Sequence, residues 1–480
     1  MTLDLVNSHS PGENMPQRDN RTPGNILETD PVAPPPTEAS QVTPKQRRRA
    51  LVSSFLGTTV EYYDFLLYGA AAGLVFPILF FPDEMDHAVG ATLSFVILLA
   101  GYVARPLGGL LFGHFGDKFG RKNILFITLM LMGVVSIAIG LMPTFATIGY
   151  AAPIALTVLR VVQGLAIGGE FAGATLMATE HVKKERRGFA SSVAVTGGPT
   201  GSVLATLVLG LFAGMPDDQF LSWGWRVPFL LSAALVIIGL YLRYRVTESP
   251  DFEKARQEGK VETGVPILRV LKKYPMETVY GIVGGAGPLF MQALLAVWMI
   301  PHLTAQGVVE RQEALYMLTF SSFIHIFAIP FFATLSDRFG RRRIMLIGAA
   351  ISVTLVFPMF AMFNSGNWWL IALAFVVGNP IIQASMYGPI GAFLAEKFEP
   401  EDRYTGVSLT FQLASVFGAG IAPLTAAWLY GLDNDQGTNN IAWWFIGMII
   451  LGAVAVILSR SKFQSRQKDP AAPVEVVAAK

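Results

Sequence analysis

Apolar residues along this chain of 480 residues are gathered into long blocks separated by short polar segments. A helix needs about 20 mostly apolar residues to cross a lipid bilayer. Twelve blocks reach that length: 50–80, 88–112, 123–142, 150–180, 189–214, 225–246, 275–303, 312–335, 343–364, 367–395, 404–430 and 441–460. The pattern therefore predicts an all-α membrane protein with 12 transmembrane helices, which we number as spans one to twelve.

A short charged turn occurs once in each half of the chain, after the second and the eighth blocks. The segment GHFGDKFGRK occupies 113–122, and SDRFGRRR occupies 336–343. The matching positions are Asp117, Phe119, Gly120 and Arg121 in the first copy, and Asp337, Phe339, Gly340 and Arg341 in the second. A turn that returns six spans later indicates a duplication. We therefore predict two pseudo-symmetric six-helix bundles, 46–246 and 275–460.

Polar segments flank and join the predicted bundles. Residues 1–45 are rich in Pro, Ser, Thr, Asn and Asp without apolar periodicity, which is typical of a disordered tail. They lack the apolar core of a cleavable signal peptide. Residues 247–274 are charged and amphipathic, which indicates a linker between the bundles, and 461–480 form a second tail.

Basic residues gather on one side of the predicted membrane. The loops that follow odd-numbered spans contain a single Lys or Arg, Arg311, whereas the opposite loops, the linker and the tails contain most of the others. Positively charged loops stay on the cytosolic side. Both termini and both charged turns are therefore predicted to be cytosolic.

Composition excludes several classes of protein. Hydrophobic residues make up 52% of the chain and charged residues 15%, against about a quarter charged in soluble domains. The chain has no Cys, so it has no disulfide and no thiolate metal site. It has no GxxxxGK[ST] loop for ATP, no HExxH and no nucleophile elbow. We expect no enzyme activity, no cofactor, no metal and no nucleic-acid partner.

Ionisable residues inside the predicted spans are candidates for function, since each costs about 2.5–3.5 kcal/mol on insertion scales. Such side chains must face a protein interior or a watery cavity. Span one contributes Glu61 and Asp64, on one helical face with Tyr68. Spans two and four contribute Arg105, Arg160, Gln163 and Glu170.

The second half supplies amides, hydroxyls and one imidazole instead of charges. His325 lies one turn from Ser321 and Ser322 in span eight. Polar stripes in spans ten and eleven comprise Asn379, Gln383, Tyr387, Ser408, Gln412 and Ser415. These side chains either contact a substrate or join helices by hydrogen bonds.

The buried charges favour proton coupling. Three acids against two arginines leave a formal charge of −1, which one proton would neutralise. Burial favours a protonated carboxyl, and a nearby Arg opposes this. The proton-coupling candidates are Glu61, Asp64 and Glu170. The substrate-binding candidates are Arg160, Arg105, Tyr68, Gln163, Asn379, Gln383 and Gln412. Static ion pairs between helices are the alternative.

Several motifs resemble a known family. GHFGDKFGRK, SDRFGRRR and Arg160 within RVVQG resemble signatures of the major facilitator superfamily. EYYDFLLYG at 61–69, ARPLGGLLFGHFGD at 104–117, GLAIGGEFAGA at 164–174 and FLSWGWRVPF at 220–229 are similar to its metabolite:proton symporter branch, which includes carriers for shikimate, α-ketoglutarate, citrate and proline or betaine. The resemblance covers about 50–460.

The resemblance implies two bundles around a central cavity that opens alternately to each side of the membrane. It assigns Asp117 and Arg121 to a cytosolic latch between the bundles, with Gly120 in the tight turn. Asp337, Gly340 and Arg341 form the second copy of this latch, in which Ser336 takes the place of Gly116.

These observations together predict a monomeric, proton-coupled importer of a small carboxylated metabolite, such as shikimate or a related organic acid, in a bacterial plasma membrane. A zwitterion such as proline or betaine, or a dicarboxylate such as α-ketoglutarate, is an alternative substrate. Two further hypotheses are a membrane sensor without transport and a proton-driven exporter, since GGPTG at 197–201 faintly resembles a motif of drug antiporters.

Overall fold

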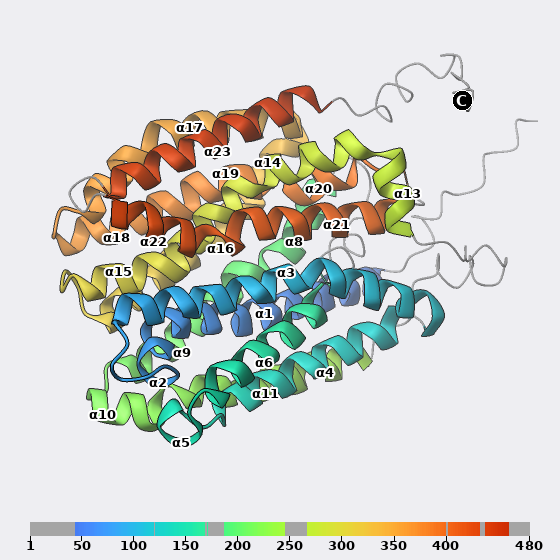
Figure 1. The fold of residues 1–480 in the computed structure, drawn as a ribbon. Coiled ribbons are helices and arrows are strands. Elements are labelled where there is room, and N and C mark those ends of the chain that lie inside the picture. Colours follow the sequence, from blue (N-terminus) through green and yellow to red (C-terminus); the bar gives the residue numbers. More distant parts are fainter. Residues whose placement is uncertain are drawn as a thin grey trace, which may run out of the picture. The chain divides into compact units, whose positions relative to one another are not determined.

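Long helices lying side by side make up most of the described part of the chain in a computed structural model (Figure 1). The structure describes residues 44–119, 121–168, 170, 187–244, 266–399, 402–432 and 437–459. None of these residues forms a β-strand. The predicted all-α fold class is therefore confirmed.

The helices of the first half follow the predicted blocks closely. They are α1 (Pro44–Leu74), α2 (Phe76–Leu79), α3 (His87–Phe119), α4 (Arg121–Gly140), α5 (Phe145–Ile148), α6 (Ala151–Ile167), α8 (Arg187–Val195), α9 (Gly197–Ala213), α10 (Asp217–Gln219), the π-helix η3 (Phe220–Gly224) and α11 (Arg226–Tyr244).

The second half begins with a short helix and continues with longer ones. Its elements are α13 (Pro266–Lys273), α14 (Pro275–Ala293), η4 (Leu294–Met299), α15 (Ile300–Ala305), α16 (Arg311–Phe339), α17 (Arg341–Phe363), α18 (Trp368–Val376), η5 (Val377–Gln383), α19 (Ala384–Tyr387), α20 (Ile390–Ala395), α21 (Arg403–Ser415), η6 (Val416–Gly420), α22 (Ala422–Leu432) and α23 (Gly437–Leu458).

The predicted spans all correspond to helices in the part of the chain that the structure describes. Nine helical stretches there are long and apolar enough to cross a membrane, and α4 and α6 contribute two shorter apolar helices. The remaining span, α1, is 31 residues long but carries Glu61 and Asp64, which lower its hydropathy. The span that is least apolar thus contains two of the candidate functional acids.

Glycine allows close packing of α3 against α6, the helices that carry Arg105 and Arg160. A Cβ at Gly108 would collide with the backbone of Leu165, and a Cβ at Gly164 would collide with the backbone of Gly101. Small residues at such crossings let helices approach closely.

Three spans of the second half change helical geometry in mid-membrane. The π-helices η4, η5 and η6 interrupt spans seven, ten and eleven. A π-helical turn changes the direction of the side chains that follow it and is frequent at functional sites. Asn379 and Gln383, two predicted substrate contacts, both belong to η5.

The predicted boundaries of the domains stay a prediction. The two tails and most of the linker lie outside the described residues, as does Gly120. The side chains of 113–122 are also outside the described set, so the first latch copy, with Asp117 and Arg121, is known only as the end of α3 and the start of α4. We call the two ends of the spans cytosolic and external, following the predicted orientation.

Candidate functional site

Asp64 is a fully buried carboxylate near the middle of α1. Its side chain is 0% exposed, and neither carboxylate oxygen has a hydrogen-bond partner of good geometry. The hydroxyls of Ser136 on α4 and Ser232 on α11 face it, and Arg160 attracts it without forming a hydrogen bond. A buried carboxylate without well-aligned hydrogen bonds is costly as an anion. This position therefore favours a carboxyl that carries a proton.

Arg160 is a buried guanidinium with donors to spare. Its Nη1 donates to Gln163 Oε1 at 2.6 Å, and Gln163 Nε2 donates to Ser136 Oγ at 3.2 Å. The Nε and Nη2 groups of Arg160 have no acceptor. Its Cζ lies 4.0 Å from the ring centroid of Tyr68 and 4.4 Å from that of Phe65. The rings stabilise the cation, but two donors remain for another acceptor.

Arg105 on α3 shares an aromatic ring with Arg160. Its Cζ lies 4.3 Å from the ring centroid of Phe65 and 4.5 Å from that of Tyr102, and its Nε has no acceptor. The two guanidinium groups therefore flank Phe65 at the centre of the first half.

A small cavity lies next to these groups, between the two halves of the chain. The first half lines it with Glu61, Tyr62, Phe65, Leu66, Tyr102 and Arg105, and the second half with Leu289, Gln292, Ala293, Val297, Ser415 and Ala419. Its volume is about 20 Å³, and a single water needs about 10–15 Å³ by this measure. A metabolite does not fit until the halves move apart.

A tyrosine pair bridges the halves close to the cavity. The hydroxyls of Tyr62 on α1 and Tyr387 on α19 lie 2.9 Å apart, within hydrogen-bond distance. Tyr387 follows Gln383 by one turn. Gln383 is 0% exposed, and neither its amide oxygen nor its nitrogen has a hydrogen-bond partner. The side chain of His325 faces Gln383, and its Nε2 also lacks a partner.

The remaining predicted site residues are distributed around this centre. Asn379 and Glu170 are buried. Gln412 Nε2 donates to the carbonyl of Gly168 at 3.1 Å, and Ser408 Oγ donates to the same oxygen at 3.2 Å. Gln412 thus joins span eleven to span four instead of lining the cavity.

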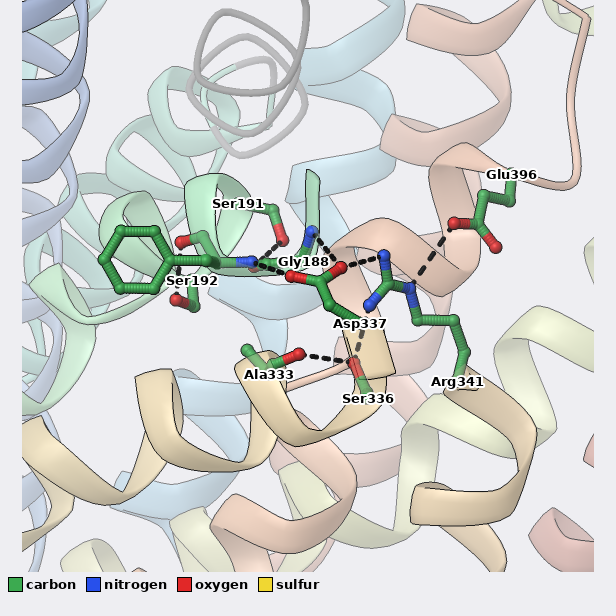
Figure 2. Close-up of polar contacts among 9 residues, drawn as sticks. Gly188, Ser191, Ser192, Ala333, Ser336, Asp337, Arg341 and Glu396 are labelled. Carbon is green, nitrogen blue, oxygen red and sulfur yellow. Dashed lines mark hydrogen bonds and ion pairs between the residues drawn. The ribbon is translucent and has the colours of Figure 1, made fainter. Parts of the chain in front are cut away.

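The second copy of the charged turn contacts the start of span five (Figure 2). Asp337 Oδ1 accepts a hydrogen bond from the backbone N–H of Gly188 at 3.0 Å, and Oδ2 accepts one from Phe189 at 2.9 Å. A carboxylate at a helix N-terminus satisfies free N–H groups and complements the helix dipole. Asp337 therefore joins the second half to the first at the cytosolic end.

Arg341 holds Asp337 in place. It pairs with Asp337 at 2.5 Å, donates to Ser336 Oγ at 2.7 Å and reaches Glu396 at 3.4 Å (Figure 2). Gly340, which lies between Asp337 and Arg341 in the sequence, has φ 95°, a conformation that favours glycine. We call Asp337, Arg341 and the first turn of α8 the cytosolic contact.

At the external end, α16 contacts span five through a basic residue, whereas the carboxylate of Asp337 makes the cytosolic contact. Arg311, the first residue of α16, donates to the carbonyls of Ala213 at 2.7 Å and Met215 at 2.9 Å, at the C-terminal end of α9. It also pairs with Asp217 at 2.6 Å. Arg226 similarly donates to the carbonyls at 140 and 142 after α4, but within the first half. We call the Arg311 interactions the external contact.

Sequence reasoning missed some residues that line or close the site. Gln292 lies inside an apolar span, and its single amide was the only signal. Arg311 stood out only as the lone basic residue of the external loops. Tyr62 was visible only as part of the segment EYYDFLLYG. Aromatic residues are common in membrane helices as packing residues, so nothing in the sequence separated Tyr102 from the others.

Two helical halves that enclose a buried polar centre, and that contact each other at both ends, define a membrane transport protein. The family model of the Major Facilitator Superfamily matches residues 55–310 and 289–479. The chain belongs to the major facilitator superfamily, and it is a multi-pass membrane transporter.

Curated relatives cover nearly the whole chain. The inner membrane metabolite transport protein YhjE of Escherichia coli K12 is 38% identical over 421 residues, which is 86% of this chain and 94% of the relative. The shikimate transporter of the same organism is 34% identical, over 86% and 95%. Its proline/betaine transporter is 31% identical, over 85% and 82%.

Solved structures share the fold at low sequence identity. A D-xylose-proton symporter has a TM-score of 0.64 and 19% identity, over 85% of this chain and 96% of that one. A partially occluded, inward-open xylose transporter from E. coli has a TM-score of 0.65 and 17% identity, over 85% and 97%. The arrangement of the helices is thus that of the family.

Proposed function

We propose that this chain imports a small carboxylated metabolite together with a proton, by alternating access. The observation that carries the proposal is the closeness of two buried groups that lack partners of good geometry: the Asp64 carboxyl, and the Nε and Nη2 donors of Arg160. A proton neutralises Asp64, and a substrate carboxylate accepts two parallel hydrogen bonds from the guanidinium of Arg160.

Binding of the proton and binding of the substrate depend on each other in this arrangement. While Asp64 is ionised, it attracts Arg160 and competes with a substrate anion for that charge. Protonation of Asp64 removes the competitor and leaves the guanidinium to the substrate. Glu61, one turn away, lines the cavity and is the second proton-coupling candidate.

Arg105 and Gln292 face the cavity and are the groups that a substrate meets first. Gln383, Asn379 and the other polar residues of the second half complete the site when the halves close around the substrate. Glu170, Gln163 and Tyr68 support the arginines.

Alternating access follows from the two contacts between α16 and span five. Release of the external contact at Arg311 opens the cavity to the outside, and release of the cytosolic contact at Asp337 opens it to the cytosol. The first copy of the turn, with Asp117, Gly120 and Arg121, takes the corresponding role at the other pair of helices.

Relatives support a carboxylated substrate. The shikimate transporter and the proline/betaine transporter carry names of compounds that contain a carboxylate. We propose an organic acid related to shikimate as the substrate, a functional monomer, and a bacterial inner membrane with both termini in the cytosol.

Uptake into proteoliposomes tests the proposal. Labelled shikimate, α-ketoglutarate, citrate, proline and betaine are each offered under an inward proton gradient and without one. We expect gradient-driven accumulation of at least one carboxylated compound. Accumulation that requires an outward proton gradient favours the exporter, and no transport of any compound by folded protein contradicts the importer.

Substitutions separate coupling from binding. Asp64→Asn should abolish gradient-driven accumulation but retain exchange of labelled for unlabelled substrate, because exchange needs no net proton movement. Glu61→Gln tests the second acid in the same way. Arg160→Lys keeps the positive charge but loses the planar guanidinium, whose parallel N–H donors bind a carboxylate. Asp83→Asn, in an external loop, is the matched control. Full accumulation by both Asp64→Asn and Glu61→Gln would show that the coupling proton binds to another group.

A further inference from the structure

The helix α13 lies immediately before span seven and does not continue it. Tyr274 separates the two helices with φ −129° and ψ 46°, outside the helical region, and Pro275 begins α14. Figure 1 shows α13 turned away from the axis of α14, at the end of the bundle of long helices. This end is the cytosolic one in the predicted orientation.

One face of α13 packs on the protein, and a second is held by ion pairs. Val270 is 0% exposed. Arg269 pairs with Asp402 at 2.9 Å, and Lys273 pairs with Asp402 at 3.0 Å and with Glu399 at 2.8 Å. Asp402 directly precedes α21, the first part of span eleven. These contacts fix the orientation of α13 on the protein.

The third face of α13 is apolar and has no covering element among the described residues. Leu268 is 56% exposed and Leu271 is 43% exposed, and they lie on one side of the helix at i, i+3 spacing. Met276 at 50% and Val279 at 47% follow in the first turns of α14. The exposed apolar surface at the start of α14 thus continues onto α13.

A basic side chain borders this apolar face. Lys272 lies one turn from Leu268 and is exposed, and no carboxylate pairs with it in the described part of the chain. A short helix with apolar residues on one side and Lys or Arg beside them lies in the membrane–water interface, where anionic headgroups attract the cation. Continuity with the exposed apolar residues at the start of α14 and the positive charge both indicate lipid as the occupant.

We propose that α13 is an interfacial helix that binds an anionic phospholipid on the cytosolic leaflet. Leu268 and Leu271 lie among the upper acyl chains, and Lys272 binds the headgroup phosphate. Because Arg269 and Lys273 tie the opposite side of α13 to Asp402, the bound lipid is linked to span eleven. Span eleven in turn reaches the first half through Ser408 and Gln412.

A single-cysteine label tests this placement on the full chain, which has no native Cys. Leu271→Cys carries an environment-sensitive fluorophore, and the protein is reconstituted with brominated phosphatidylcholine or brominated phosphatidylglycerol. We expect quenching by both lipids, with phosphatidylglycerol enriched up to about fivefold at equal mole fraction. Ile237→Cys, exposed on span six, should be quenched equally by both.

The headgroup is tested by Lys272→Gln in the Leu271→Cys background. The preference for phosphatidylglycerol should disappear while quenching by phosphatidylcholine remains. Absence of quenching at Leu271, with normal quenching at Ile237, would place α13 outside the membrane and overturn the proposal. Equal quenching by the two lipids in the parent would overturn the headgroup site. Neither readout depends on substrate transport, so failure of the transport proposal is a separate result.

Discussion

Arg311 and Asp337 lie at opposite ends of α16 and contact opposite ends of span five, which consists of α8 and α9. Arg311 donates to carbonyls at the C-terminal end of α9, and Asp337 accepts from N–H groups at the N-terminal end of α8. Each charge has the sign that stabilises the helix end it contacts. Span eight therefore holds span five at both sides of the membrane.

Loss of the cytosolic contact should open the cavity to the cytosol. Asp337→Ala removes an N-terminal cap, which costs about 0.5–2 kcal/mol. Ser415→Cys, which lines the cavity, serves as a reporter for a membrane-impermeant thiol reagent. Labelling from the cytosolic side should become about two- to thirtyfold faster.

A glycine beside this contact gives an independent test. A Cβ at Gly188 would press on Arg341 and Asp337, so Gly188→Ala should reproduce the effect of Asp337→Ala. Ser191→Ala is the matched control on the same helix, because Ser191 Oγ only donates to the carbonyl of Gly188 (Figure 2). Unchanged labelling in both Asp337→Ala and Gly188→Ala would show that this contact does not set access.

Loss of the external contact should have the opposite effect. Arg311→Gln cannot supply the three donors that reach Ala213, Met215 and Asp217. Labelling of Ser415→Cys from the external side should become faster, while labelling from the cytosolic side stays the same or falls. Arg226→Gln also removes a guanidinium from carbonyls, but within one half, so it should lower Tm without changing access.

Close packing of α3 and α6 should make Gly164 intolerant of a methyl group. Gly164→Ala forces the helices apart and should cost about 1–3 kcal/mol of unfolding free energy. Thermal unfolding in detergent measures the loss. Gly447→Ala is the control, since it lies in helix α23 with open space around it and should be neutral or slightly stabilising. Equal Tm values for the two variants would contradict the packing argument.

Lys397 should make stability depend on pH. It lies two residues beyond α20, 5% exposed, with its ammonium 4.0 Å from the ring centroid of Phe393. The pKa of this ammonium is lowered from 10.5 to about 7, chiefly by burial and also by the charge of Arg342, while Glu277 and Glu396 oppose the shift. Between these two values the unfolded chain binds more protons, so the free energy of unfolding rises with pH from about 7 toward 10.5.

The variant Lys397→Met removes the cost of burying the charge. Its Tm should exceed that of the parent by a few degrees at pH 6.5, and the gain should shrink at pH 9, where the parent already carries a neutral amine. A gain of equal size at both pH values would argue against the lowered pKa.

The helical spans were predictable because a bilayer imposes one requirement, a long apolar helix, on each of them. The same requirement makes charged residues inside a span easy to recognise. Asp64 and Arg160 were visible as charges that no lipid-facing position tolerates. The turn at Gly340 was also predictable, since a glycine between phenylalanine and arginine recurs in both halves.

Contacts between the halves were not predictable in the same way. Asp337 meets Gly188 across 149 residues of chain, and nothing local in either segment identifies the partner. Gln412 belongs to a polar stripe that suits a cavity, yet the crossing of spans four and eleven places it on the carbonyl of Gly168. Such pairings depend on how helices cross, which periodicity does not encode.

The size of the cavity has a consequence for the cell's energy supply. Protons cross proteins along continuous chains of hydrogen-bonded water, and a cavity of about 20 Å³ holds about one molecule. This cavity therefore cannot hold a continuous chain of water across the membrane in this conformation. Under the proposed proton coupling, a carrier that waits in this state for its substrate does not leak protons through this cavity, so the proton gradient is kept for transport.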